Sequence, residues 1–415
     1  MKHAVALLSC VLALVLCLGG CGVEDSTEPS LLTPEIPSAS QEPETPEVPV
    51  LPEPVLPEEP QLPEDPEAPE DALTAQARAI LETLTEEQVL GQLFFARRPA
   101  SDAAAVMAEY QLGGYLLFRR DYQDGLGEWL TRDAFLRQLE TDRAAAVIPP
   151  FFGTDEEGGT VCRASQNPHL FSQKFASPQK LYRQGGLEAL RQDAADKSRG
   201  LLELGININF APVADVSTDS GDFIYARSLG QGAEETAAYT AAVVEEMQGA
   251  GMGSVLKHFP GYGSNGDTHT DVITDSRPRA DFDSCDFLPF QAGIQAGATA
   301  VLVSHNIVEC MDAALPASLS PEVHRVLREE LGFSGLILTD DLAMDAVRQY
   351  TDDGSAAVLA LLAGNDMVVT SDPVGDISAV QAALEAGTLE WDSLRQACLR
   401  VLRAKLALGI LSPAN

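Results

Sequence analysis

Hydrophobic positions in most of the chain fall into short, nearly continuous apolar runs, separated by longer stretches with helical spacing. Strands of a parallel sheet give such runs, because helices cover the sheet on both faces. Eight runs are predicted to be strands: Gln92–Ala96, Gly114–Phe118, Pro150–Asp155, Ile206–Val216, Ser254–Pro260, Ala300–Asn306, Gly335–Asp341 and Asp366–Ser371. The helical stretches between them include Leu187–Leu204, Glu234–Gln248, Pro321–Leu331 and Ala356–Ala363.

Eight strands that alternate with helices predict an α/β fold, a single (β/α)8 TIM barrel. An open, doubly wound sheet is the alternative that counting strands does not remove. Polar residues at the ends of the runs favour the barrel, because the loops that follow barrel strands converge on one mouth. These strand-end residues are Asp155, Asp215, Lys257, His258, His305, Asn306, Asp340, Asp341 and Ser371.

The first 20 residues have the pattern of a signal peptide. Lys2 stands before an apolar run from residue 4 to residue 18, which is short for a membrane-spanning helix. The run ends in Leu-Gly-Gly-Cys, which resembles the bacterial lipobox and implies lipid attachment at Cys21. An ordinary secretory signal or a single anchor helix is the alternative. The lipobox predicts an extracytoplasmic protein anchored to the bacterial cell membrane.

Residues 21–71 are predicted to be a disordered, Pro/Glu-rich linker. Residues 22–71 hold 13 of the 26 prolines and 15 acidic residues, without a lysine or arginine. Prolines remove backbone donors and like charges repel, so this segment is expected to remain extended. The globular domain is therefore expected to span residues 72–415.

The charge of the chain excludes one class of partner. A formal net charge of -35 repels nucleic acid at long range, so no nucleic-acid function is expected. Beyond the signal and Cys21, the cysteines Cys162, Cys285, Cys310 and Cys398 match no zinc pattern and are interpreted as mostly buried apolar residues.

A glycine-rich loop after the fifth predicted strand carries a candidate pair for proton transfer. Asp267 and His269 are two residues apart in it, and a carboxylate beside an imidazole favours the protonated ring. A plain surface loop, or a metal site made by Asp267, His269 and Asp271, is the alternative.

Two further acidic segments end predicted strands. Asp340 and Asp341 follow the seventh strand, where only one of two neighbours is expected to face the barrel axis, with the other tied to backbone or to a helix start. A helix cap is the alternative role for either one. Asp155 opens an acidic run before two glycines and is a candidate acceptor for sugar hydroxyls.

Together these segments resemble glycoside hydrolase family 3, and more narrowly its β-N-acetylglucosaminidase branch. The matching segments are GTDEEGGTVCR at 153–163, KHFPGYGSNGDTHTD at 257–271 and GLILTDDLAM at 335–344, supported by LGQLF at 90–94, GGYLLF at 113–118, NFAPVADV at 209–216, ARSLG at 226–230 and LPASLS at 315–320. The resemblance covers roughly residues 74–411. The sequence differs from the usual residues of this family at Thr160, Cys162 and Tyr262. These differences leave the specificity for the leaving group open.

The resemblance implies roles for individual residues. Asp340 matches the family's nucleophile, and His269 matches the acid/base of this branch, with Asp267 as its partner. Sugar contacts fall on Asp155, Arg163, Arg227, Lys257 and His258. No cofactor and no metal ion are implied.

The implied activity is a retaining exo-β-N-acetylglucosaminidase that acts on a carbohydrate, with peptidoglycan fragments as the leading source and chitin fragments as a second. A family 3 β-glucosidase or xylosidase, a catalytically dead glycan-binding lipoprotein, and phosphorolysis in place of hydrolysis are the alternatives. The protein is expected to be a monomer held at the membrane by its lipid anchor.

Overall fold

The eight predicted strands form one parallel sheet. The computed structural model describes residues 71–266, 273–344, 347, 350 and 355–412. The chain divides into two units, Met1–Asp65 and Pro66–Asn415, and all described residues belong to the second. The sheet order is β10-β7-β5-β4-β3-β2-β1-β11. Its strands are β1 (Phe94–Arg97), β2 (Gly114–Leu117), β3 (Phe151–Thr154), β4 (Ile208–Asn209), β5 (Gly253–Phe259), β7 (Ala300–Val303), β10 (Leu336–Thr339) and β11 (Val368–Thr370).

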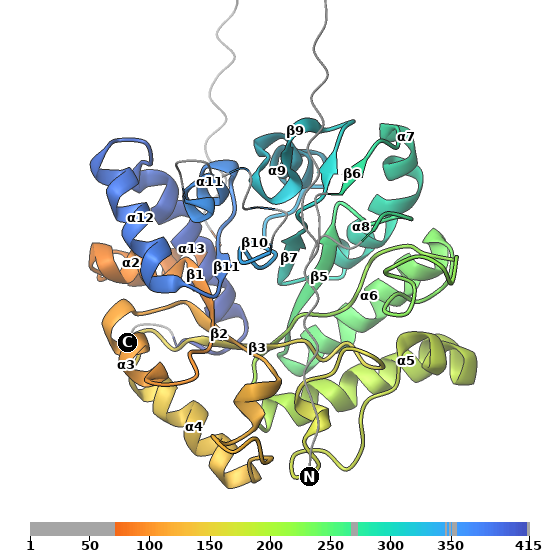
Figure 1. The fold of residues 1–415 in the computed structure, drawn as a ribbon, viewed down its shortest axis with the longest axis horizontal. Helices are drawn as coiled ribbons and strands as arrows, with labels where there is room; N and C mark the ends of the chain where they lie inside the picture. The colour runs from red at the N-terminus through yellow and green to blue at the C-terminus, as the bar shows by residue number, and fades with distance from the viewer. Residues whose placement is uncertain (1–70, 267–272, 345–346, 348–349, 351–354, 413–415) are drawn as a thin grey trace, which may run out of the picture. The chain divides into compact units, whose positions relative to one another are not determined.

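The sheet closes on itself, so the chain forms a barrel (Figure 1). Leu338 and Met367 form a parallel bridge between the two outermost strands, β10 and β11. The backbone N–H of Asp366 donates to the carbonyl of Ile337 at 2.8 Å, beside this bridge. This closure confirms the (β/α)8 prediction and removes the doubly wound alternative, whose sheet would have two open edges.

Helices surround the barrel, as the helical stretches of the sequence predict (Figure 1). They are α1 (Ala72–Leu81), α2 (Glu86–Gln92), α3 (Ala103–Tyr110), α4 (Arg132–Ala144), α5 (Pro178–Leu202), α6 (Ala233–Ala250), α7 (Arg279–Asp281), α8 (Phe287–Gln295), α9 (Pro321–Arg325), α11 (Ala356–Ala363), α12 (Pro373–Glu385) and α13 (Trp391–Ala407). A small second sheet, ordered β6-β8-β9, contains β6 (Thr274–Asp275), β8 (Ile307–Val308) and β9 (Asp312–Pro316).

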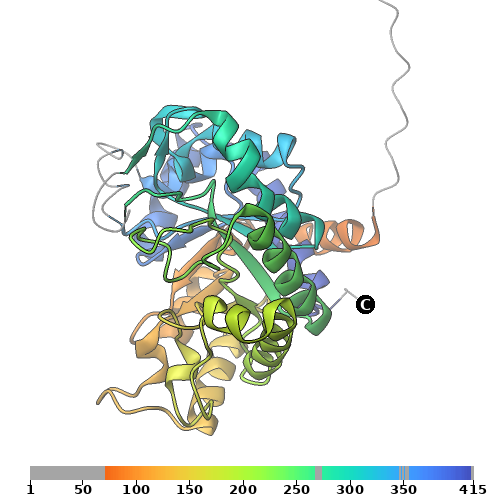
Figure 2. The same ribbon diagram turned by 90° about the vertical axis from the view of Figure 1, so that its right-hand side faces the viewer.

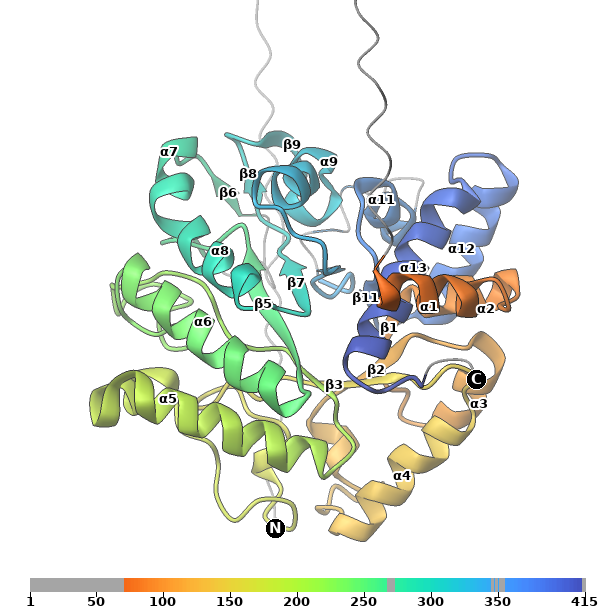
Figure 3. The same cartoon turned by 180° about the vertical axis from the view of Figure 1, so that it is seen from behind.

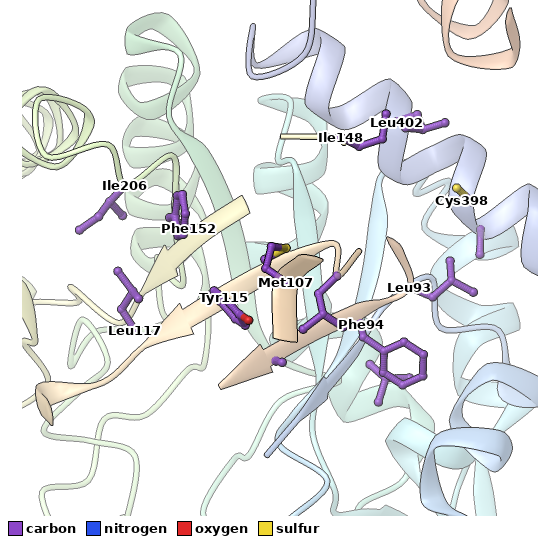
Figure 4. Close-up of a cluster of buried hydrophobic side chains, with 14 of the residues drawn as sticks. Leu93, Phe94, Met107, Tyr115, Leu117, Ile148, Phe152, Ile206, Cys398 and Leu402 are labelled. Carbon is purple, nitrogen blue, oxygen red and sulfur yellow. The ribbon is translucent and has the colours of Figure 1, made fainter. Parts of the chain in front are cut away.

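Side chains alternate between the two faces of the strands, and both faces are buried. Phe94, Tyr115 and Phe152 point outward and pack with the surrounding helices (Figure 4). Their neighbours Phe95, Leu116 and Phe151 belong to a separate cluster inside the barrel. This double burial explains why the strands read as continuous apolar runs in the sequence.

Aromatic rings fill the inside of the barrel below its mouth. The rings of Phe95 and Phe151 stack with centroids 5.9 Å apart, and Phe210 meets Phe95 edge-on at 5.3 Å. Gly153 on β3 leaves the room for these rings, because a Cβ there would lie 2.8 Å from both Phe95 and Phe210. The interior is therefore a packed core that forms a floor under the strand ends.

The chain enters the barrel domain at the end opposite the mouth. Asp71 caps α1 by accepting hydrogen bonds from the backbone of Leu73 and Thr74, each at 3.0 Å. Leu73 lines a surface pocket with Thr299 and Gly335, which lie just before β7 and β10 begin. Figures 2 and 3 show α1 beside α13 at this base of the barrel. Helix α1 thus lies on the far side of the barrel from the strand ends.

Among the described helices, none has the length and apolarity needed to cross a bilayer. The four described cysteines are unpaired. Cys162 and Cys398 are buried as predicted, whereas Cys310 is exposed and Cys285 is half-buried.

Candidate active site

A pocket with an empty volume of about 780 Å³ opens at the carboxyl ends of the barrel strands. It is lined by Arg97, Leu116, Phe118, Asp155, Val161, Arg163, Phe210, Arg227, Lys257, His258, Leu302, Asp340, Asp341, Met344 and Val369. These residues come from all eight strands of the barrel or the loops that follow them. The six site residues predicted from sequence that the structure describes, Asp155, Arg163, Arg227, Lys257, His258 and Asp340, all line this pocket.

Lys257, near the end of β5, is held by two carboxylates. Its ammonium lies 2.8 Å from Oδ1 of Asp155 and 2.6 Å from Oε1 of Glu157. Glu157 also accepts from the guanidinium of Arg227 through both of its oxygens, at 2.8 and 3.0 Å. One buried carboxylate therefore fixes two cations at the pocket wall, and the bidentate pair fixes the plane of the guanidinium.

The proton affinity of Glu157 follows from this arrangement. Burial alone would raise the pKa of the Glu157 carboxyl, but the charges of Lys257 and Arg227 outweigh burial and hold its pKa well below the usual range. Glu157 is thus an anion at neutral pH.

His258 is oriented from both of its ring nitrogens. Its Nδ1 lies 2.8 Å from Oδ2 of Asp215, and its Nε2 lies 3.1 Å from Nη2 of Arg227. Because Asp215 can only accept and Arg227 can only donate, the tautomer with its proton on Nδ1 satisfies both contacts. Asp215 also accepts from the backbone N–H of His258 and of Tyr262, at 3.0 and 2.9 Å. Asp215 therefore fixes the start of the loop after β5.

Arg163 reaches the pocket from the loop after β3. Its guanidinium lies 3.8 Å from Asp155 Oδ2 and rests over the ring of Phe118, 5.7 Å from the centroid. Buried Glu156 accepts from the backbone N–H groups of Arg163 at 2.9 Å and Ser165 at 3.2 Å, which holds the loop in place. The three consecutive acidic residues thus have different roles. Asp155 lines the pocket, Glu156 accepts the hydrogen bonds that hold the loop, and Glu157 binds the side chains of Lys257 and Arg227.

Asp340 and Asp341 both line the pocket. The expectation that only one of the two faces the barrel axis stays a prediction, and both residues follow the last strand residue, Thr339. Asp341 is tied to backbone as expected, since its Oδ1 accepts from the N–H of Ala343 at 2.9 Å. The backbone N–H of Asp341 donates to Oδ1 of Asp340 at 2.8 Å.

Sequence reasoning missed Arg97 and Glu157 and noted Asp215 only as a polar residue at a strand end. Arg97 ends β1, contacts the Asp341 carboxylate through Nε and lines the pocket. Glu157 and Asp215 support the lining residues from behind. A charged residue directly after an apolar run was a usable signal for Arg97, as it was for Asp340. The roles of Glu157 and Asp215 depend on contacts with residues 43 or more positions away, which no local pattern reveals.

Other strand-end residues lie away from the pocket. His305 is buried, with Nδ1 at 2.7 Å from Ser318 Oγ and Nε2 at 3.1 Å from the carbonyl of Asp341. Asn306 is buried beside Ser304, and Ser371 is exposed. Polar strand ends in this barrel therefore include supporting residues as well as residues that face the pocket.

Asp267 and His269, the predicted acid/base pair, lie outside the described residues. The segments on either side are described and are joined to each other. Asn265 donates from its side chain to Oδ2 of Asp275 at 2.7 Å, and Arg277 donates to both Asp275 and Asp286. The hydrogen bond between Asn265 and Asp275 therefore links the two sides of the segment that contains His269, and the ion pairs of Arg277 hold the second side.

Comparison with known proteins gives one consistent result. A sequence model of the Glycosyl hydrolase family 3 N terminal domain matches residues 84–404. A "Beta-hexosaminidase" of Stenotrophomonas maltophilia is 34% identical over 72% of this chain and 86% of its own length. "Beta-hexosaminidase LpqI" of Mycobacterium tuberculosis is 30% identical over 80% of this chain and 85% of its own length.

Solved structures agree with the sequence relatives. A family 3 β-N-acetylglucosaminidase from Paenibacillus superposes with a TM-score of 0.72 at 29% identity, over 80% of this chain. The match spans 64% of the length of that structure. The structure of M. tuberculosis LpqI superposes with a TM-score of 0.70 at 29% identity, over 78% of this chain and 95% of that one.

Proposed function

The chain belongs to glycoside hydrolase family 3, and from this membership we propose that it is a retaining exo-β-N-acetylglucosaminidase. Asp340 is the nucleophile in this proposal, and His269 with Asp267 is the acid/base pair. One observation carries the proposal: Asp340 shares a single pocket with Asp155, Arg163, Arg227, Lys257 and His258. A carboxylate among fixed hydrogen-bonding groups is what attack on a bound sugar requires.

The first step forms a bond between the Asp340 carboxylate and the anomeric carbon while the bond to the leaving oxygen breaks. His269 donates a proton to the leaving oxygen and then removes a proton from the water that releases the sugar. An imidazole in this role replaces the second carboxylic acid of the common retaining plan. Asp267 keeps the ring protonated before the first step by its negative charge.

The sugar is held by the paired charges at the pocket wall. Asp155 offers carboxylate oxygens, and Lys257, Arg163 and Arg227 offer N–H donors to ring hydroxyls. Because Glu157 and Asp155 fix these donors before the substrate arrives, little orientation is lost on binding.

We further propose that the substrate is a glycan of the cell wall, with terminal β-linked N-acetylglucosamine in peptidoglycan fragments. The names of the β-hexosaminidase relatives support the sugar, and the lipobox at residues 18–21 supports an extracytoplasmic, membrane-anchored enzyme.

Hydrolysis of aryl N-acetyl-β-glucosaminides by the wild type and Asp340→Ala tests the proposal. The wild type releases N-acetylglucosamine, and Asp340→Ala loses at least about 10³-fold in kcat. A matched panel of aryl glucosides and xylosides separates the related activities, and product analysis in phosphate buffer separates hydrolysis from phosphorolysis. Glycan binding without turnover by the wild type would identify a binding protein and contradict the proposal.

His269→Ala tests the acid/base assignment. The variant loses ~10²–10⁴-fold on natural glycans, where the leaving oxygen needs a proton, and keeps most of its first-step rate on aryl glycosides with good leaving groups. Equal losses on both substrates would show that His269 is not the acid.

A further inference from the structure

Every polar group of Asp341 is engaged. Its carboxylate accepts from the N–H of Ala343 at 2.9 Å and from Nε of Arg97. Its carbonyl lies 3.1 Å from Nε2 of His305, and its N–H donates to Asp340 at 2.8 Å. Asp341 is buried, so these contacts are shielded from water and stronger than at a surface.

Arg97 is held on two sides. Its Nε contacts Asp341, and its guanidinium carbon lies 4.4 Å from the ring centroid of Phe118. Arg97 comes from β1 and Asp341 follows β10, so their pair joins the strands on either side of β11, from residues 244 positions apart in the chain. Within the described part of the chain, Asp341 is the acceptor that Arg97 contacts.

The hydrogen bond from Asp341 to Asp340 acts on the proposed nucleophile itself. An amide N–H that donates to a carboxylate oxygen is a charge-assisted hydrogen bond, which fixes the plane of the carboxylate and favours its anionic form. The geometry of this bond depends on where the Asp341 backbone lies, and Arg97, Ala343 and His305 all restrain that backbone.

We propose that Arg97 and Asp341 form a positioning pair that holds the Asp340 carboxylate in the orientation for attack on the sugar. This inference rests on the proposed role of Asp340 as nucleophile. Arg97 and Asp341 also place one positive and one negative charge beside Asp340. The pair therefore orients the nucleophile without a net change in the local charge.

The proton affinity of Asp340 depends on every charge around the pocket. The charged or titratable groups that face it are Arg97 from β1, Asp155 and Arg163 from β3 and its loop, Arg227 from the loop after β4, Lys257 and His258 from β5, and Asp341 after β10. Arg97 and Asp341 pair with each other, whereas Asp155 pairs with Lys257 at 2.8 Å and lies 3.8 Å from Arg163. Removal of one partner leaves the other charge uncompensated next to Asp340.

Two single variants and their combination test the pair, with the acid limb of the pH profile of kcat/KM as the readout. Arg97→Gln leaves the negative charge of Asp341, so the limb moves to higher pH by about one unit. Asp341→Asn leaves the positive charge of Arg97, so the limb moves to lower pH by a similar amount. The double variant returns the limb close to its wild-type position. In each single variant kcat falls about 10- to 100-fold, with a smaller change in KM.

Controls separate this effect from changes in fold or overall charge. Arg132→Gln and Glu203→Gln change the same net charge at an exposed pair, 3.2 Å apart, and leave the profile unchanged. Arg97→Lys retains the charge but loses the fixed fork of the guanidinium, so it lowers kcat about 10-fold without moving the limb. This variant remains informative if Arg97→Gln does not fold.

Two results would overturn the inference: single variants that move the acid limb in the same direction or not at all, and Arg97→Lys with wild-type kcat. Asp340→Ala distinguishes failure of this inference from failure of the proposed function. If Asp340→Ala is inactive while the pair variants keep the wild-type profile, only the positioning role is wrong. If Asp340→Ala retains activity, the nucleophile assignment itself is wrong.

Discussion

Two lysines are buried at opposite ends of the same barrel, and their surroundings differ. Lys257 at the mouth is 2% exposed and lies between two carboxylates, Asp155 and Glu157. Lys405 on α13, at the base, is 0% exposed, and its ammonium donates to the neutral side-chain amide of Gln92 at 2.6 Å. It also lies 5.1 Å from the centroid of the Phe151 ring.

The difference shows what each end of the barrel requires. Burial lowers the pKa of Lys405 to about 7, because no carboxylate offsets the loss of hydration. At the mouth, two carboxylates offset the same cost, so a fixed cation is available to a substrate. Of these two lysines, the one with carboxylate partners lies at the pocket and the one held by a neutral amide lies at the base.

The largest effect is expected for Lys257→Met. The substitution leaves Asp155 and Glu157 close together without their shared cation, and loss of one partner of a buried ion pair costs about 3–5 kcal/mol. We expect a lower melting temperature and a loss of at least about 10²-fold in kcat/KM. Calorimetry and aryl glycoside assays measure the two quantities. Wild-type activity and stability in Lys257→Met would show that the positive charge of Lys257 is needed neither for catalysis nor for the fold.

Glu157→Gln removes the carboxylate that holds Lys257 and Arg227. Orientation of both cations is weakened, so kcat/KM should fall about 10- to 100-fold. The pH dependence of stability gives a second readout. Because the folded-state pKa of Glu157 is lowered, its contribution is full above the unfolded value of about 4.5 and is lost as the pH falls below it. Urea midpoints of the wild type and variant should therefore differ most at neutral pH and converge in acid. A difference in urea midpoint that does not change with pH would show that the charge of Glu157 does not contribute to stability in this way.

The smallest effect on catalysis is expected for Lys405→Met, the matched change at the base. Activity should remain within about twofold, because Lys405 is at the amino ends of the strands. Wild-type stability should rise with pH between about 7 and 10.5, since in that interval the folded lysine has released its proton and the unfolded lysine has not. The variant lacks this dependence. It should be more stable than the wild type by about 1–2 kcal/mol near pH 6, with the gain shrinking as the pH rises. A gain that does not change with pH would contradict this interpretation of the base.

The fold was predictable from sequence because burial on both strand faces leaves a strong local pattern. All eight predicted runs contain the observed strands to within one residue at either end. The run Ile206–Val216 was predicted too long, since β4 covers only Ile208–Asn209. Pro212 lacks the N–H that a continued ladder needs. Likewise, Gly185 and Gly186 interrupt the helical pattern, so the first part of α5 was missed.

Site residues that directly follow a strand could be predicted from the sequence. Site residues whose role depends on a partner far away in the chain could not. Asp155, Lys257 and Asp340 follow apolar runs and could be found from the sequence. Arg227 pairs with Glu157, 70 residues away, and Arg97 pairs with Asp341, 244 residues away. An arginine can pair with any of many acidic residues, so the sequence alone does not identify these partners. The short strands β6, β8 and β9 also escaped prediction, because segments of two to five residues carry too little periodicity.

The most direct measurement is mass spectrometry of the enzyme after treatment with a 5-fluoro N-acetylglucosaminyl fluoride, which slows release of a covalent glycosyl-enzyme more than its formation. The wild type should gain the mass of one fluorosugar on the peptide that contains Asp340, and Asp340→Ala should gain none. A label on a different carboxylate, or turnover of the reagent by Asp340→Ala at the wild-type rate, would contradict the assignment of Asp340 as the nucleophile.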